Sequence, residues 1–150
     1  MRAVLQRVSH ASVSVDNTVI GEIGRGIMAL VSVEQEDTDS DAVYIADKIA
    51  ALRIFRDDND KMNLSLTDVG GQALVISQFT LHGDCRRGRR PSFVRAAPPE
   101  SAVPLYERVV ARLRDNNGIT VATGSFGAYM RVSLVNDGPV TLLLDSSKAF

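Results

Sequence analysis

The sequence predicts one α/β domain over residues 1–150, with α+β as the alternative class, built on a mixed, largely antiparallel or barrel-like sheet with two packed helices. The length of 150 residues suits one domain with a sizeable core. Period-two alternation of apolar and polar residues dominates both ends of the chain. Two segments with a 3.6-residue apolar period interrupt the strands, and they do not alternate with them as in a strict βαβ repeat.

The first third of the chain predicts strands that lead into a central strand. Residues 1–8 and 11–23 alternate as half-buried strands do, and Asp16 and Asn17 supply a turn within the second segment. Residues 27–33 form a continuous apolar run. Such a run is typical of a strand that is buried on both faces.

The middle of the chain predicts the first helix, an acidic turn and a further strand. Thr38 is a suitable helix cap, and the residues that follow it place an apolar stripe at Ala42, Ile45, Ala46, Ile49, Ala50 and Leu52. The acidic segment 57–61 lacks the glycine and the distal glutamate of an EF-hand, so we expect a solvated turn. Residues 73–81 are expected to form one strand.

The last third predicts a second helix and three strands. The helix is expected to begin near Ser101, with Pro104 confined to its first turn, and to end at residues 116–118. Strands are expected at 119–122, 130–135 and 140–145. On the residues alone, the segment 136–139 is a hairpin turn between the last two strands.

Composition limits the classes of protein. The net charge of −1 argues against non-specific coating of nucleic acid. The single Cys85 excludes an intramolecular disulfide and a cysteine metal cluster, and it fits a reducing compartment. No apolar run reaches the ~18 residues of a membrane span, and the first residues do not resemble a signal peptide. We therefore expect a cytoplasmic protein.

The residues offer few candidates for catalysis. His10 and His82 have no metal-ligand spacing around them, so we expect neither a metal nor a cofactor. Thr80 and His82 would share one face of a strand and could act as nucleophile and base, although a simply exposed histidine explains the pattern as well. A run of arginines follows at once, and a solvated surface segment is its simplest interpretation: Arg86, Arg87, Arg89, Arg90 and Arg95.

Two polar interruptions of apolar strands are more informative together than singly. They are residues 77–81, Ser-Gln-Phe-Thr-Leu, and residues 136–141, Asn-Asp-Gly-Pro-Val-Thr. Proline is unusual at such a position because it gives no hydrogen bond to a neighbouring strand. Hydroxyls, an amide, a rigid Gly-Pro pair and nearby arginines suit a site that holds an anionic, phosphate-bearing substrate.

These two segments resemble the signature motifs of the D-aminoacyl-tRNA deacylase family. Further segments are similar to the family in the same order, at 5–8, 61–63, 90–93 and 133–135, so the resemblance runs almost from end to end. It implies hydrolysis of the ester of D-aminoacyl-tRNA, and of glycyl-tRNA, to free amino acid and tRNA. It also implies a homodimer with active sites at the subunit interface.

The resemblance further implies how L-aminoacyl groups are rejected. Gly138 and Pro139, joined by a cis peptide bond, would enter the pocket of the partner subunit and exclude the side chain of an L-residue. Exclusion of this kind would let one pocket accept many D-residues and glycine, because it measures configuration and not side-chain type.

The resemblance also suggests a role for each motif residue. The catalytic segment would be Ser77, Gln78, Phe79 and Thr80, with the Phe79 and Thr80 amides supporting the oxyanion and the Thr80 hydroxyl orienting water. Nucleophilic attack by Thr80 is the less favoured option, because no base for it is evident. Supporting residues would be Arg7, Asn136, Met130 and Phe93. The candidates for tRNA phosphate contacts are Arg86, Arg87, Arg89 and Arg90.

The chain departs from the family pattern at Ser32, at His82 and Gly83, and at Tyr129.

Two other functions are alternatives to the deacylase. A tRNA-binding module without chemistry would use the same arginines, and a small-molecule esterase would use Thr80 and His82.

Overall fold

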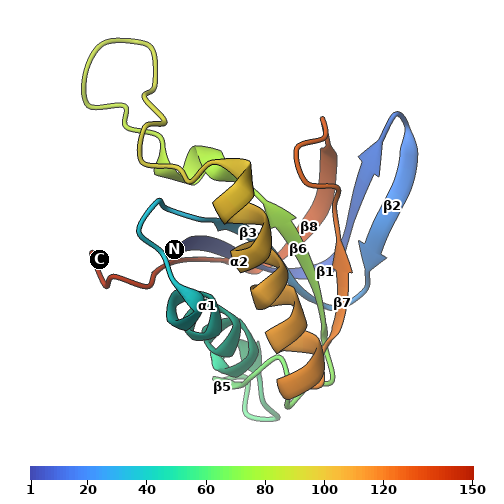
Figure 1. The fold of residues 1–150 in the computed structure, drawn as a ribbon. Coiled ribbons are helices and arrows are strands. Elements are labelled where there is room, and N and C mark those ends of the chain that lie inside the picture. The colour runs from blue at the N-terminus through green and yellow to red at the C-terminus, as the bar shows by residue number, and fades with distance from the viewer.

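The computed structural model describes residues 1–150 as a curved sheet with two helices on one face (Figure 1). In chain order the elements are β1 (Arg2–Val15), β2 (Thr18–Ile23), β3 (Gly26–Ser32), α1 (Asp39–Ala51), β4 (Phe55–Arg56), β5 (Met62–Leu64), β6 (Gln72–Ser77), the 3-10 helix η1 (Phe79–His82), α2 (Pro99–Ala111), the π-helical turn η2 (Arg112–Asn116), β7 (Thr120–Thr123) and β8 (Arg131–Asp145). None of the helices is long and apolar enough to cross a bilayer.

The sheet is mixed, which confirms the predicted fold class. Its path runs β2-β1-β3-β6-β7, and β8 lies on the other edge of β1. Pairings of β1 with β2, β3 and β8 are antiparallel, whereas β3, β6 and β7 run parallel. The predicted turn at Asp16 and Asn17 is present, and both residues have positive φ, at 49° and 63°. Positive φ at both central residues is typical of the tight hairpin turn whose twist matches the flanking strands.

The strand β3 is buried on both faces, as the apolar run predicts. Ile27, Ala29 and Val31 belong to the larger core cluster, which lies beneath α1 and α2. Met28 belongs to a second cluster, enclosed where β1, β2 and β8 curl over the other face. Helices on one side and a curled sheet on the other therefore explain why this strand carries no polar alternation.

The two helices are joined by ion pairs as well as by apolar packing. Thr38 caps α1 in a capping box with Asp41, as the sequence predicts. Arg108 of α2 pairs with Asp39 at 2.7 Å, and Arg112 pairs with Asp47 of α1 at 2.9 Å. Arg108 of α2 and Arg112 of η2 thus tie this segment to α1.

The second helix begins earlier than the sequence predicts. It starts at Pro99, so Pro104 lies in its second turn, whereas the sequence predicts the first. Proline there supplies no N–H to the carbonyl four residues back, which belongs to the exposed residue Glu100. Water can satisfy that carbonyl, which explains why the position tolerates proline. The predicted end is correct, and Gly118 adopts a φ of +65° there.

The prediction of one strand over residues 73–81 is wrong beyond Ser77. The N–H of Gln78 makes the last bond to β3, donating to the carbonyl of Val31 at 2.8 Å. Past this point neither neighbouring strand offers a partner, since β3 ends at Ser32. The chain therefore turns into η1, where the N–H of Leu81 donates to the carbonyl of Gln78 at 3.2 Å.

The predicted hairpin turn at residues 136–139 is also wrong. β8 is continuous through this segment, and both of its halves pair with β1. Thr141 pairs with Gln6 and Asn136 with Val8, so residues 137–140 stand opposite Arg7 alone. We call this excess of chain the 137–140 bulge. Its Gly138-Pro139 peptide bond is cis.

Candidate functional site

Residues 77–80, which we call the 77–80 turn, join the end of β6 to η1. The backbone of Gln78 is tied to β3, and its side-chain amide donates to the Thr80 hydroxyl oxygen at 2.5 Å. The Phe79 side chain is 55% exposed although it is apolar, and Thr80 is exposed too. The N–H groups of Phe79 and Thr80 lie in the first turn of η1. The first N–H groups of a helix have no backbone acceptor within that helix. The turn thus presents backbone donors and a hydroxyl at the surface.

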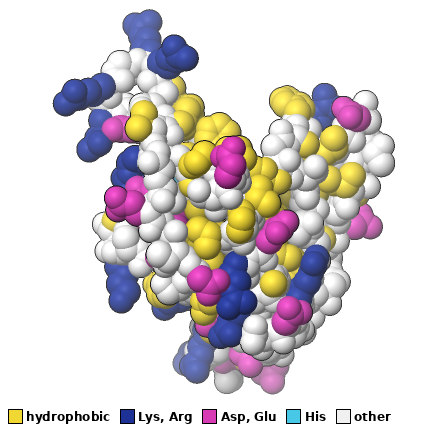
Figure 2. Space-filling view, in the orientation of Figure 1, with side chains coloured by type: hydrophobic (Ala, Val, Ile, Leu, Met, Phe, Trp, Pro, Cys, Tyr) yellow, Lys and Arg dark blue, Asp and Glu magenta, His cyan; other side chains and the backbone are white.

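Two adjoining apolar cavities flank Phe79, with volumes of about 320 and 270 Å³. Both are lined by Ser77, Phe79, Phe126 and Gly127. Figure 2 shows hydrophobic side chains gathered in the hollow between the basic loop at the upper left and the arm of β1 and β2 at the upper right. The 77–80 turn therefore lies between two apolar hollows.

Two of the predicted supporting residues lie beside this turn. The Phe93 ring packs edge to face on Phe79, with ring centroids 5.2 Å apart. Gly83 makes room for it, because a Cβ there would lie 2.9 Å from a Phe93 ring carbon. Met130 lines the smaller of the two cavities.

Sequence reasoning missed Phe126, which lines both cavities and stacks at a tilt on Tyr106, with ring centroids 6.2 Å apart. The only signal was an aromatic residue between Gly124 and Gly127, in the segment between two expected strands.

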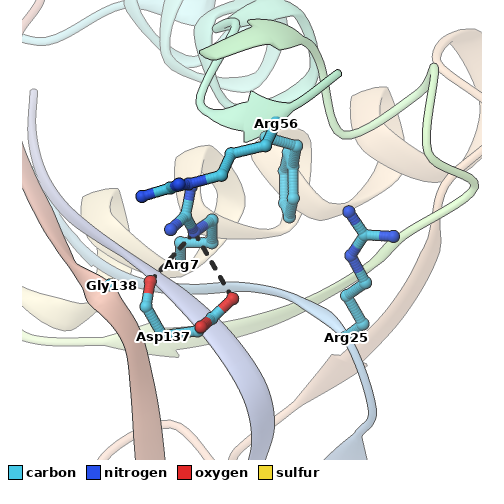
Figure 3. A pocket seen from close by; sticks show the side chains of 6 residues that line it. Arg7, Arg25, Arg56, Asp137 and Gly138 are labelled. Carbon is cyan, nitrogen blue, oxygen red and sulfur yellow. Dashed lines mark hydrogen bonds and ion pairs between the residues drawn. The ribbon is translucent and has the colours of Figure 1, made fainter. Parts of the chain in front are cut away.

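The 137–140 bulge lines a different cavity, of about 330 Å³ (Figure 3). Its lining residues are Arg7, Arg25, Phe55, Arg56, Asp137 and Gly138. No residue of the 77–80 turn contributes to it. One copy of the chain therefore does not bring the two signature motifs into one cavity.

Side-chain hydrogen bonds of Arg7 and Asn136 hold the bulge in place. Arg7 is only 4% exposed, and it donates to the carbonyl of Asp137 at 2.9 Å and to that of Ile54 at 2.5 Å. Asn136 accepts from the N–H of Val140 at 2.9 Å and donates to the hydroxyl of Thr141 at 2.9 Å. Gly138 has a φ of +139°, which favours glycine at the tip.

The arginine loop, residues 84–95, projects from the same end of the molecule as the 77–80 turn (Figures 1 and 2). Arg86 is paired with Asp84 at 2.6 Å, and this guanidinium holds the pKa of the carboxyl well below its usual range. Within the loop, the exposed arginines that form no ion pair are Arg87, Arg89 and Arg90. The loop therefore has guanidinium groups free to contact an anionic partner.

His82 is not placed to act as a base for Thr80, which contradicts the proposed pair. Because the chain is helical here, the shared strand face does not exist. The ring is 2% exposed, its Nδ1 bonds the Ser32 hydroxyl at 2.7 Å, and its Nε2 has no hydrogen-bond partner. No group of three or more His, Cys, Asp or Glu side chains is placed to hold a metal ion.

Known proteins match this chain in sequence and in structure. The family model described as D-Tyr-tRNA(Tyr) deacylase matches residues 4–145. D-aminoacyl-tRNA deacylases from Clostridioides difficile and Thermotoga petrophila are 59% and 57% identical, and in each case the match covers 100% of both chains.

Among solved structures, a protein titled c-Myc DNA Unwinding Element Binding Protein is 40% identical, with a TM-score of 0.91 over 97% of this chain and 98% of its own. A probable eukaryotic D-amino acid tRNA deacylase shares the fold, with a TM-score of 0.82 at 19% identity, over 95% of this chain and 97% of its own. The family model spans nearly the whole chain, the curated relatives match it at full length, and the two solved structures have the same fold. The chain therefore belongs to the D-Tyr-tRNA(Tyr) deacylase family.

Proposed function

We propose that the protein, acting as one domain, hydrolyses the ester between a D-amino acid and the terminal ribose of tRNA. The family and the names of the curated relatives supply the substrate class. The observation that carries the proposal is the 77–80 turn, which exposes amide donors and a hydroxyl between two apolar cavities. An ester with a ribose and base on one side and an amino-acid side chain on the other suits such a pair of hollows.

The chemistry needs little beyond positioning, since an aminoacyl ester is already activated. Water would attack the carbonyl carbon, and the amides of Phe79 and Thr80 would stabilise the charge that develops on the carbonyl oxygen. The carbon–oxygen bond to the ribose then breaks, and the ribose oxygen takes up a proton. Thr80 would orient the water, because its oxygen already accepts from Gln78 and the candidate base His82 bonds Ser32 instead.

The test is release of free amino acid from D-tyrosyl-tRNA by the purified protein with a chelator present. We expect release well above the spontaneous decay of the ester, and retention of the activity in chelator. Decay at the background rate, together with salt-dependent tRNA binding, would instead establish an RNA-binding module without chemistry.

We also propose that the active site is completed by a second copy of the chain. The 77–80 turn and the 137–140 bulge line separate cavities, so only a neighbour could bring them together. The exposed side of β8 is partly apolar, with Val135 58% and Leu143 60% exposed. A homodimer with two-fold symmetry would cover this surface and supply each pocket with the partner's bulge.

In such a dimer Gly138 and Pro139 would reject the L-configuration by steric exclusion. The bulge is anchored by Arg7, so its backbone can resist the side chain of an L-aminoacyl group. A D-residue directs its side chain elsewhere, and glycine has none, so glycyl-tRNA should also be cleaved. The enzyme would then proofread charged tRNA in the cytoplasm, where translation uses it.

The arginine loop should contribute to tRNA binding and not to the chemical step. Changing Arg87, Arg89 and Arg90 together to Gln should raise KM for D-tyrosyl-tRNA and leave kcat almost unchanged. The slope of log affinity against log salt should fall by up to about 0.9 for each phosphate that the loop no longer neutralises. Titrating salt in steady-state assays measures both effects.

A variant with Lys48, Arg53 and Lys61 changed to Gln is the matched control, because it removes the same charge from exposed positions in α1, just after it and in the turn before β5. An equal rise in KM in both variants would show that only net charge matters and that the loop has no specific role.

A further inference from the structure

A buried polar pair lies directly beneath the 77–80 turn and has no part in the chemistry described above. Ser32, the last residue of β3, and His82, the last residue of η1, are each 2% exposed. The Ser32 hydroxyl is 2.7 Å from His82 Nδ1 and donates to the carbonyl of Phe79 at 3.3 Å. Burying two polar side chains is costly unless they bond, and here the bonds end on the backbone of the turn.

The carbonyl that Ser32 contacts belongs to the same peptide unit as the Thr80 N–H. That unit is planar, and in the usual trans form its C=O and N–H point in opposite directions. Ser32 holds the carbonyl from the buried side, so the N–H of Thr80 is directed away from the core. In the proposed function, this N–H stabilises the charge that develops on the carbonyl oxygen of the ester.

The hydroxyl of Ser32 has one proton, which limits how the pair can be arranged. If that proton goes to the Phe79 carbonyl, the oxygen is left to accept the Nδ1–H of His82. A neutral ring then has no proton on Nε2. This nitrogen is buried and unpartnered, 3.8 Å from a Glu34 oxygen, and the same carboxylate is held by Arg95.

Burial of the His82 side chain favours a neutral ring. Burial lowers the pKa of the imidazole, and the Glu34 carboxylate opposes this to a lesser extent. Arg2 and the N-terminal amino group lower the pKa further, whereas Asp37 raises it.

We propose that Ser32 and His82 form a buried clamp that fixes the Phe79–Thr80 peptide unit and so aims the Thr80 N–H at the reacting ester. Both are positioning residues. His82 lines neither cavity, and Ser32, which lines the larger one, acts through its bonds to the Phe79 carbonyl and to His82. The inference rests on the proposed function for its catalytic meaning, whereas the clamp itself is a property of the folded chain.

Four variants in the full-length protein test the clamp. Ser32→Ala removes the hydroxyl, and His82→Gln moves the side-chain amide away from the Nδ1 position. Each should lower kcat for D-tyrosyl-tRNA by about tenfold, the value of roughly one hydrogen bond, with KM unchanged. His82→Asn can place an N–H where Nδ1–H lies and should keep most of the wild-type kcat. The double variant of Ser32→Ala with His82→Gln should be no worse than either single one, because both break the same clamp.

A second measurement does not depend on activity. The backbone order parameter of the Thr80 N–H, from NMR relaxation, should be ~0.85 in the wild type and in His82→Asn, and below ~0.6 in Ser32→Ala. Unchanged kcat and order in Ser32→Ala would overturn the clamp, as would a His82→Asn variant that behaves like His82→Gln. If the wild type fails to cleave D-tyrosyl-tRNA, the proposed function falls, and the order parameter still decides the clamp.

Discussion

Replacing Phe79 by proline should lower kcat for D-tyrosyl-tRNA by about 10²- to 10³-fold relative to Phe79→Ala, the usual cost of removing one oxyanion donor. Proline has no N–H, and it is tolerated at the first position of a helical turn, which Phe79 occupies in η1. Alanine removes the exposed ring but keeps the N–H. The ratio of the two variants therefore isolates the backbone donor from the side chain.

Single-turnover hydrolysis of D-tyrosyl-tRNA measures this ratio, with circular dichroism and thermal unfolding as controls for the fold. The Phe79 ring packs on Phe93 and otherwise borders the two cavities. Its loss should therefore cost little packing, and both variants should unfold near the wild-type temperature. Equal kcat in Phe79→Pro and Phe79→Ala would show that this amide does not support the oxyanion.

Substituting Gly138 by alanine should reduce the preference for D-tyrosyl-tRNA over L-tyrosyl-tRNA by at least about tenfold. A Cβ at this position would lie 2.9 Å from the Arg7 Nη2 and 2.9 Å from a Val140 methyl group, and the φ of +139° disfavours any L-residue. The bulge must then shift, and the exclusion of L-side chains that it provides should weaken. Initial rates on the two esters give the preference directly.

Gly70→Ala is the matched control, because Gly70 also has positive φ, at +58°, and nothing lies within 4 Å of its Cβ position. It places an L-residue at positive φ without the close contacts of Gly138, so it should lower stability and leave the preference intact. An unchanged preference in Gly138→Ala would show that the bulge does not select between the D- and L-esters.

Mixing the two variants tests whether the bulge acts on the partner subunit. Adding excess Phe79→Pro chains to Gly138→Ala chains forms mixed dimers, in which each intact 77–80 turn would meet a wild-type bulge. Cleavage of L-tyrosyl-tRNA should therefore fall as the Phe79→Pro chain is added, while D-tyrosyl-tRNA cleavage persists. If the bulge acted within its own chain, cleavage of the L-ester would be unaffected by the added subunits.

Local patterns in the sequence are sufficient to predict most of the fold. The strand follows from the apolar run of residues 27–33, the helix start from the cap at Thr38, and the turn from Asp16 and Asn17. Each depends on short-range chemistry, and the structure has all three. The two signature segments are visible for the same reason, because polar residues that interrupt an apolar strand stand out in a single sequence.

The two main errors in the predicted strands come from long-range pairing. Residues 73–81 have the pattern of one strand, but the strand ends where β3 offers no further partner after Ser32. The segment 136–139 has the residues of a hairpin turn, but both of its flanks pair with β1, so the excess chain becomes a bulge. No local pattern states which strand a segment will pair with. The buried pair of Ser32 and His82 is equally hidden, since its members are far apart in sequence.

The most direct test of the central claim, that this chain reads the configuration of the amino acid on tRNA, is a comparison of initial rates on matched D- and L-tyrosyl-tRNA. Glycyl-tRNA serves as the third substrate. We predict cleavage of the D- and glycyl-esters and only spontaneous decay of the L-ester, since the L-side chain alone would meet the bulge. Equal enzymatic rates on the D- and L-esters would contradict selection by configuration.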